Sequence, residues 1–191
     1  MNIRSADTNI IVDLKYSTEN NFLRKDLYGD FCNCYLQKEV VEKLLNAQQL
    51  LKNEFPQYNL MVWDCVRSRS IQWKMWEMLK MPDKEKGKYV SNPKYGSLHN
   101  FGAAVDLTVA GENGRELDMG TPYDFFGELA HPEREQDFLK KGELTEPQIE
   151  NRRLLRRVMY GSGFFNIQTE WWHFNSCYRK EAIENNYPLI E

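Results

Sequence analysis

Hydrophobic residues recur along the chain in two patterns, one helical and one extended. In residues 37–55 apolar side chains return every three or four positions, which is typical of one buried helix face, and Pro56 ends the pattern. Similar spacing predicts further helices, and compact apolar runs predict short strands. The predicted helices cover residues 70–79 and 146–160, and the predicted strands cover residues 60–63, 104–109 and 164–168.

These elements do not alternate in the regular strand–helix–strand order of a parallel sheet, and no glycine-rich phosphate loop occurs. We therefore expect an α+β fold with helices packed on a small, mostly antiparallel sheet. A chain of 191 residues without internal repeats or a linker is consistent with one domain covering residues 1–191.

The charge balance and the absence of long apolar runs exclude several classes of function. The net charge of −3 provides no basic excess for a nucleic-acid surface. No run of about 18 apolar residues occurs, so we expect no membrane span. The first residues lack the apolar centre of a signal peptide, so we expect a cytoplasmic protein, or a periplasmic one whose leader has been removed.

Four cysteines are present, and their spacing indicates neither a zinc ribbon nor an obvious disulfide. Cys32 and Cys34 are too close for an easy mutual bridge, and there is no Cys-x-x-Cys pair. We interpret all four cysteines as free thiols.

The stretch around residues 97–109 has the composition of a metal-binding loop that enters a strand. His99 offers an imidazole nitrogen and Asp106 a carboxylate oxygen, and small residues between them, including Gly102, allow the backbone to fold back. Taken alone, such a pair is more often a hydrogen-bonded structural contact than a metal site.

A second motif, Glu170-Trp171-Trp172-His173, changes this balance. A catalytic zinc site needs a third protein ligand, which His173 can provide, and a carboxylate beside the metal that is not a ligand, which Glu170 can provide. Side chains three apart face opposite ways on a flat strand, so we predict that the backbone turns between these two residues. For the two tryptophans, core packing is the simpler interpretation.

The two motifs together resemble zinc peptidases that act on D-alanyl-D-alanine. The matching residues are Ser97-x-His99-x-x-Gly102-x-Ala104-x-Asp106 and Glu170-x-x-His173, and Glu170-Trp171-Trp172-His173 is similar to the D-Ala-D-Ala dipeptidases of the vancomycin-resistance type. Further matches, from residue 21 to residue 153, extend the resemblance over nearly the whole chain. It implies the hedgehog/DD-peptidase fold, which lysostaphin-type peptidases share.

The resemblance implies a role for individual residues. One Zn²⁺ per chain would be held by His99, Asp106 and His173, and Glu170 would act as the general base on the zinc-bound water. Arg67 would stabilise the oxyanion; the family commonly has Tyr-Arg-Pro where this chain has Val66-Arg67-Ser68.

Two further residues would bind the substrate. Asp124 would bind the free ammonium of the dipeptide, and Ser97 would form a hydrogen bond with the substrate. The expected partner is thus a small peptide, D-Ala-D-Ala, and the expected reaction is its hydrolysis to two D-alanines. The alternatives are a D,D-carboxypeptidase or another cell-wall peptidase on the same fold, or a zinc-binding module without activity.

Overall fold

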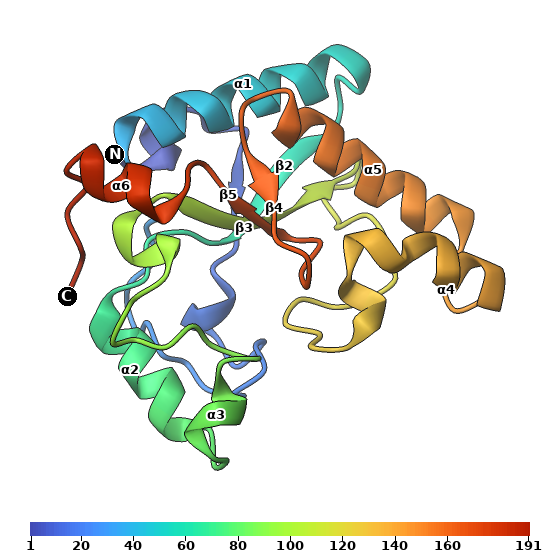
Figure 1. Cartoon of the computed structure of the whole chain (residues 1–191). Coiled ribbons are helices and arrows are strands. Elements are labelled where there is room, and N and C mark those ends of the chain that lie inside the picture. The colour runs from blue at the N-terminus through green and yellow to red at the C-terminus, as the bar shows by residue number, and fades with distance from the viewer.

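The computed structural model describes all residues, 1–191, and contains one five-stranded sheet with helices around it (Figure 1). The strands are β1 (Ile11–Val12), β2 (Asn59–Asp64), β3 (Ala104–Ala110), β4 (Phe165–Asn166) and β5 (His173–Asn175). The α-helices are α1 (Lys38–Glu54), α2 (Arg69–Met78), α3 (Asp83–Lys86), α4 (Glu135–Lys141), α5 (Glu146–Tyr160) and α6 (Arg179–Glu184).

The order of the strands in the sheet is β1-β2-β3-β5-β4. Only the β1–β2 pair is parallel, and the other three pairs are antiparallel. The predicted α+β class with a mostly antiparallel sheet is therefore confirmed. The pairing brings Asp106 on β3 directly opposite Asp64 on β2 and opposite His173 on β5.

Helices α1 and α5 pack together over one face of the sheet (Figure 1). Their apolar positions, which the sequence periodicity identified, join those of β2 and β3 in one buried cluster that includes Leu44, Leu51, Leu107 and Leu155. Burial of such side chains stabilises a domain by about 1.5–3 kcal/mol each before entropy is counted. Every residue of β3 is buried, so this layer holds the strand that carries Asp106 in place.

The opposite face of the sheet is covered less completely. Helix α2 and the N-terminal segment pack on each other there through Tyr16, Met75 and Trp76, in a separate apolar cluster. The helix begins after Ser68, whose side chain accepts a hydrogen bond from the Ile71 N–H at 3.2 Å. These segments leave the ends of β3 and β5 accessible from one side.

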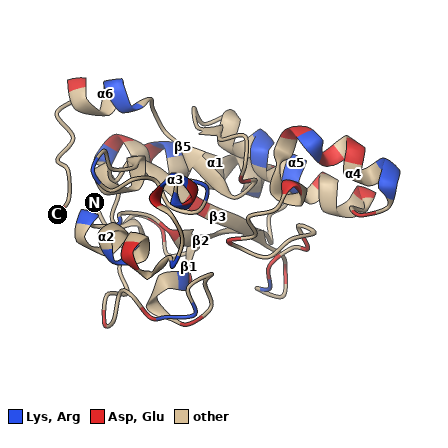
Figure 2. Cartoon of the chain, turned by 60° about the horizontal axis from the view of Figure 1, so that its bottom comes forward, with Lys and Arg blue, Asp and Glu red and all other residues tan.

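The predicted strands and long helices all occur, with bounds shifted by a few residues. Basic and acidic residues are interspersed along α4 and α5 (Figure 2). None of the helices is both long enough and apolar enough to cross a bilayer.

The interpretation of all four cysteines as free thiols is wrong for two of them. Cys34 and Cys65 form a disulfide with a Cα–Cα distance of 5.7 Å, while Cys32 and Cys177 are free. Thirty-one residues separate the paired cysteines, and only the approach of the chain before α1 to the end of β2 brings them together. Sequence spacing could not reveal this contact.

Candidate active site

Three side chains from two segments that are far apart in the sequence converge at the ends of β3 and β5. His99 lies on the short 3₁₀ helix Leu98–Phe101, which Gly102 ends with a left-handed φ of 61°, and Asp106 follows on β3. His173 opens β5. Their ligand atoms lie within 4.8 Å of one another, so the sequence prediction that these residues meet is correct.

The donor set has the dimensions of a zinc site. His99 Nε2 lies 3.2 Å from His173 Nδ1 and 3.3 Å from Asp106 Oδ1, and His173 Nδ1 lies 2.9 Å from the same oxygen. Ligands about 2.0–2.1 Å from a tetrahedral zinc are about 3.3 Å apart, so the three atoms need to move little to hold the ion.

Hydrogen bonds behind the site orient both imidazoles. His99 Nδ1 donates to the backbone oxygen of Cys65 at 2.6 Å, which leaves Nε2 free as a ligand. His173 Nε2 is bonded to Asn175 Oδ1 at 2.8 Å, which leaves Nδ1 facing Asp106. Nε2 of His99 and Nδ1 of His173 thus face the same position beside Asp106.

Asp106 uses its second oxygen to bind a tyrosine. The Tyr123 hydroxyl donates to Asp106 Oδ2 at 2.8 Å, and burial, followed by the charge of Asp106, raises the pKa of this hydroxyl well above its usual value. Burial alone would raise the pKa of Asp106, but the two histidines lower it, so the carboxylate is ionised. Burial would lower the pKa of His173, and the hydrogen bond to Asp106 reverses this and raises it to about 9.

Glu170 lies beside the cluster of His99, Asp106 and His173. It sits in the loop between β4 and β5, where the backbone bends before His173, as predicted from the spacing. Its Oε2 is 3.9 Å from His173 Nδ1, and its side chain is 22% exposed. Burial raises the pKa of Glu170. The charge of His173 lowers it by less than burial raises it, and the charge of Asp106 adds a smaller rise. A carboxyl group with a raised pKa next to a metal site suits proton transfer.

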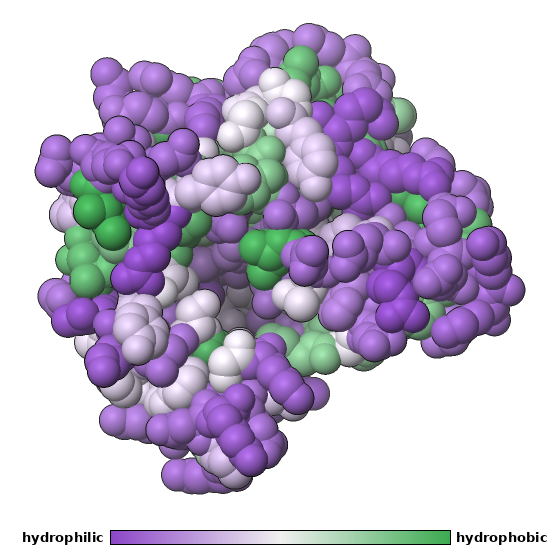
Figure 3. All heavy atoms as spheres, viewed as in Figure 1, coloured by the Kyte–Doolittle hydropathy of each residue, from purple (hydrophilic) through white to green (hydrophobic).

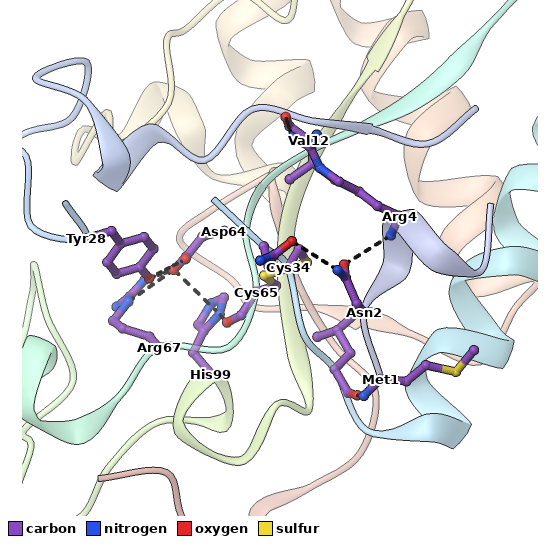
Figure 4. The surroundings of a disulfide bond; sticks show 12 residues. Met1, Asn2, Arg4, Val12, Tyr28, Cys34, Asp64, Cys65, Arg67 and His99 are labelled. Carbon is purple, nitrogen blue, oxygen red and sulfur yellow. Dashed lines mark hydrogen bonds and ion pairs between the residues drawn. A yellow bond between two sulfur atoms is a disulfide. The ribbon is translucent and has the colours of Figure 1, made fainter. Parts of the chain in front are cut away.

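Arg67 points into the same region from the segment after β2 (Figure 4). Its guanidinium binds Asp64 Oδ2 through both Nε and Nη2, and Nη2 lies 4.0 Å from Asp106 Oδ2. The Tyr28 hydroxyl donates to the other oxygen of Asp64 at 2.6 Å, and the ring of Tyr16 lies 5.0 Å below the guanidinium. Both oxygens of Asp64 therefore accept hydrogen bonds, and the two contacts of the guanidinium with Oδ2 fix the orientation of Arg67.

The backbone around Arg67 is held without the proline and the aromatic residue that the family commonly has. The Arg67 N–H donates to the His99 oxygen at 3.1 Å, and the Arg67 oxygen accepts from Asn100 Nδ2 at 2.8 Å. Ser68 caps α2 directly afterwards. Val66-Arg67-Ser68 is thus tied to the loop that carries His99.

Asp124 forms the far wall of the site. Its carboxylate accepts hydrogen bonds from the Tyr16 hydroxyl at 3.1 and 3.2 Å and from the Phe22 N–H at 3.3 Å. Asp124 has a φ of 58°, a left-handed conformation that is rare for a residue with a side chain. Burial and the charge of Asp106 raise the pKa of Asp124 well above its usual value. An arriving cation would therefore find a carboxyl group that lacks a charged partner.

A buried arginine fixes the segment that carries Tyr123 and Asp124. Arg152 of α5 donates to the Met119 oxygen at 2.7 Å and to the Leu129 oxygen at 3.0 Å, and its side chain is fully buried. The two carbonyls flank the segment on either side of Asp124.

The residues surround a cavity of about 380 Å³, which is visible as a hollow near the centre of Figure 3. Its lining includes both histidines, Asp106, Arg67, Asp124 and Glu170. Ser97 also lines the cavity and donates to Gln72 Oε1 at 3.1 Å. Trp171 and Trp172 are each 1% exposed, which confirms core packing, and Trp172 also forms part of the cavity wall.

Sequence reasoning missed the residues that orient the site, namely Tyr16, Tyr28, Tyr123 and Asn175. Asn175 could have been predicted from the sequence, because it lies two residues after His173 and residues two apart on a strand face the same side. The three tyrosines had none, since each contacts a carboxylate far away in the sequence.

Comparison with known proteins gives one consistent result. The model of the Peptidase_M15 family, described as D-ala-D-ala dipeptidase, matches residues 2–189. The D-alanyl-D-alanine dipeptidase of Escherichia coli (strain K12) is 31% identical over 179 residues, which are 94% of this chain and 82% of that protein. The D-alanyl-D-alanine dipeptidase of Enterococcus faecium is 29% identical over 190 residues, 92% of this chain and 89% of that protein.

A solved LdcB LD-carboxypeptidase superimposes with a TM-score of 0.47 and 21% identity, over 81% of this chain and 66% of that chain. The family match extends over nearly the whole length and includes every segment that contributes to the cavity. The resemblance seen in the two motifs is therefore confirmed, and the chain belongs to the M15 peptidase family of D-Ala-D-Ala dipeptidases, which makes it a hydrolase of the metallopeptidase class.

Proposed function

We propose that this chain is a zinc-dependent D-Ala-D-Ala dipeptidase that uses the residues around the cavity for the reaction. The observation that carries the proposal is the triangle of ligand atoms from His99, Asp106 and His173, with edges of 2.9–3.3 Å and the Glu170 carboxylate beside it. Two imidazoles and one carboxylate suit zinc and leave a coordination position open.

Bound by these three residues, zinc would supply Lewis acidity and activate water near neutral pH. Glu170 takes a proton from the attacking water, and later gives it to the leaving amine. The raised pKa of Glu170 strengthens its carboxylate as the base in the first transfer. Arg67 is positioned by Asp64 to donate to the carbonyl oxygen as negative charge develops there.

Asp124 provides the preference for a dipeptide. Burial of Asp124 disfavours its ionised form. A substrate ammonium beside this carboxyl group would favour the ionised form and would form an ion pair with it. An acylated or longer N-terminus has no ammonium at that place, so it would leave the carboxyl group buried without a partner. Ser97 lies on the cavity wall within reach of the peptide as a further hydrogen-bonding group.

The test combines metal analysis with release of D-alanine from D-Ala-D-Ala, before and after treatment with a chelator. We expect one zinc per chain and loss of hydrolysis on its removal. Glu170→Gln should retain the metal and lose roughly 100- to 10,000-fold in kcat. Glu112→Gln, in an exposed turn, is the matched control and should behave as the unmodified protein.

Full activity of Glu170→Gln with bound zinc would refute the assignment of the base. Cleavage of a pentapeptide stem in preference to the free dipeptide would indicate a D,D-carboxypeptidase. Bound zinc without hydrolysis of either substrate would indicate a binding module.

A further inference from the structure

The cavity contains two cationic side chains that the proposed mechanism does not use. Three cations line it, Arg67, Lys88 and Arg179. Arg67 is neutralised by Asp64. Lys88 and Arg179 form no ion pair with any carboxylate of the chain. The cavity lining therefore contains two positive charges that can bind an anionic group of a ligand.

Arg179 is the better fixed of the two. It is the first residue of α6, and its Nη1 donates to the Gly96 oxygen at 3.2 Å. Its guanidinium lies over the ring of Phe101, 5.9 Å from the centroid. Both contacts hold the group in place and neither neutralises it, and a guanidinium has five N–H donors. Both residues are exposed, but Lys88 lies in a turn and its side chain forms no hydrogen bond with the rest of the chain.

The position of Arg179 gives the cavity an electrostatic direction. Gly96 directly precedes Ser97, on the loop that carries His99, whereas Asp124 contacts Tyr16 and Phe22. Helix α6 and the segment of residues 117–130 lie on opposite sides of β3 and β5 (Figure 1). The site thus has an acidic wall at one end, the metal ligands in the middle and a free cation at the other end.

We propose that Arg179 binds the C-terminal carboxylate of the substrate; this inference rests on the proposed dipeptidase function. A free dipeptide carries an ammonium on one side of its single peptide bond and a carboxylate on the other. With the ammonium at Asp124 and the carbonyl at Arg67, the carboxylate extends toward the loop of Ser97 and Arg179. A planar guanidinium matches a carboxylate through two parallel hydrogen bonds.

Both ends of the substrate are then recognised by charge, and the distance between the two charged walls selects for length. A carboxylate group has the same charge before and during the reaction. Its binding to Arg179 therefore contributes equally to the ground state and the transition state, and its loss raises KM while kcat changes little.

The experiment measures KM and kcat for D-Ala-D-Ala and for its C-terminal amide. For Arg179→Met we expect a roughly tenfold rise in KM with D-Ala-D-Ala, because the lost contact is a charged hydrogen bond at a partly exposed rim. With the amide, Arg179→Met and the unmodified protein should have equal KM values. Arg179→Lys keeps the charge and should recover part of the affinity.

Lys180→Met is the matched control. Lys180 is the next residue of α6, its side chain is 84% exposed and it pairs only with Glu184 at 3.6 Å. This variant removes the same charge from the same helix and should leave both KM values unchanged. Calorimetric binding of D-Ala-D-Ala to Glu170→Gln, with and without Arg179→Met, repeats the comparison without turnover.

Equal KM values of Arg179→Met and the unmodified protein for D-Ala-D-Ala would overturn the inference. So would a tenfold loss in Lys88→Met that Arg179→Met does not show. If the unmodified protein with bound zinc does not hydrolyse D-Ala-D-Ala, the proposed function fails instead, which is a different result from an unchanged KM in an active enzyme.

Discussion

Replacing Asp124 by asparagine should reduce activity and raise stability at the same time. The substitution is nearly isosteric, and asparagine tolerates the left-handed φ of 58° better than other residues with side chains. The amide oxygen can still accept the hydrogen bond from the Tyr16 hydroxyl. The variant therefore removes the negative charge and little else.

The loss of activity follows from the position of the charge. Two unit charges about 4 Å apart attract by about 4 kcal/mol at an effective dielectric constant of 20. Asp124 must first lose the proton that its raised pKa favours, which offsets part of this attraction. A net loss of about 2–3 kcal/mol is reasonable for a buried pair, or roughly 30- to 150-fold in kcat/KM for D-Ala-D-Ala.

The gain in stability follows from the same pKa. The folded chain holds the proton of Asp124 more tightly than the unfolded chain does. Stability therefore falls as the pH rises above about 3.9, the ordinary pKa of an aspartate, and Asp124→Asn removes this dependence. At pH 7 the unfolding temperature of the variant should exceed that of the unmodified protein, and at pH 4 the two should be closer.

The assay compares kcat/KM for D-Ala-D-Ala with that for its N-acetyl derivative, alongside thermal unfolding at both pH values. Asp30→Asn is the control, because Asp30 is exposed and outside the cavity. The variant should lose its advantage for the free dipeptide, while the N-acetyl substrate should be cleaved as slowly as before. An equal loss with both substrates, or a lower unfolding temperature at pH 7, would refute the reasoning.

Three further predictions concern the candidate metal site and the cysteines. Tyr123→Phe removes the hydrogen bond to Asp106 and should weaken zinc binding about 10- to 100-fold in competition with a chelator; an unchanged affinity would contradict this role. The pKa of His173 is about 9 without metal, so zinc must displace a proton from this residue when it binds. The affinity for zinc should therefore rise about tenfold per pH unit between pH 6 and 8, and an affinity independent of pH would contradict this. Without reductant, alkylation should leave the linked Cys34–Cys65 peptide intact and modify the other two cysteines, and modification of all four would disprove the bridge.

The sequence by itself was sufficient for the long elements of the core and for the candidate site residues. The periodicity of residues 37–55 and the apolar run at 104–109 depend only on neighbours a few positions apart, and both elements occur. The residues of the candidate metal site could be identified because His99 and Asp106 lie in one short motif and Glu170 and His173 lie in another.

Only the tertiary structure decided how these groups are oriented. Tyr16 reaches Asp124 and the Arg67 guanidinium, and Cys34 reaches Cys65, through contacts between segments that no local pattern relates. The antiparallel pairing of β3 with β2 and β5 brings those segments to one end of the sheet. Arg179 reaches the cavity for the same reason, because helix α6 packs on the loop of His99. Sequence periodicity relates only residues up to about four positions apart, so it cannot predict this contact.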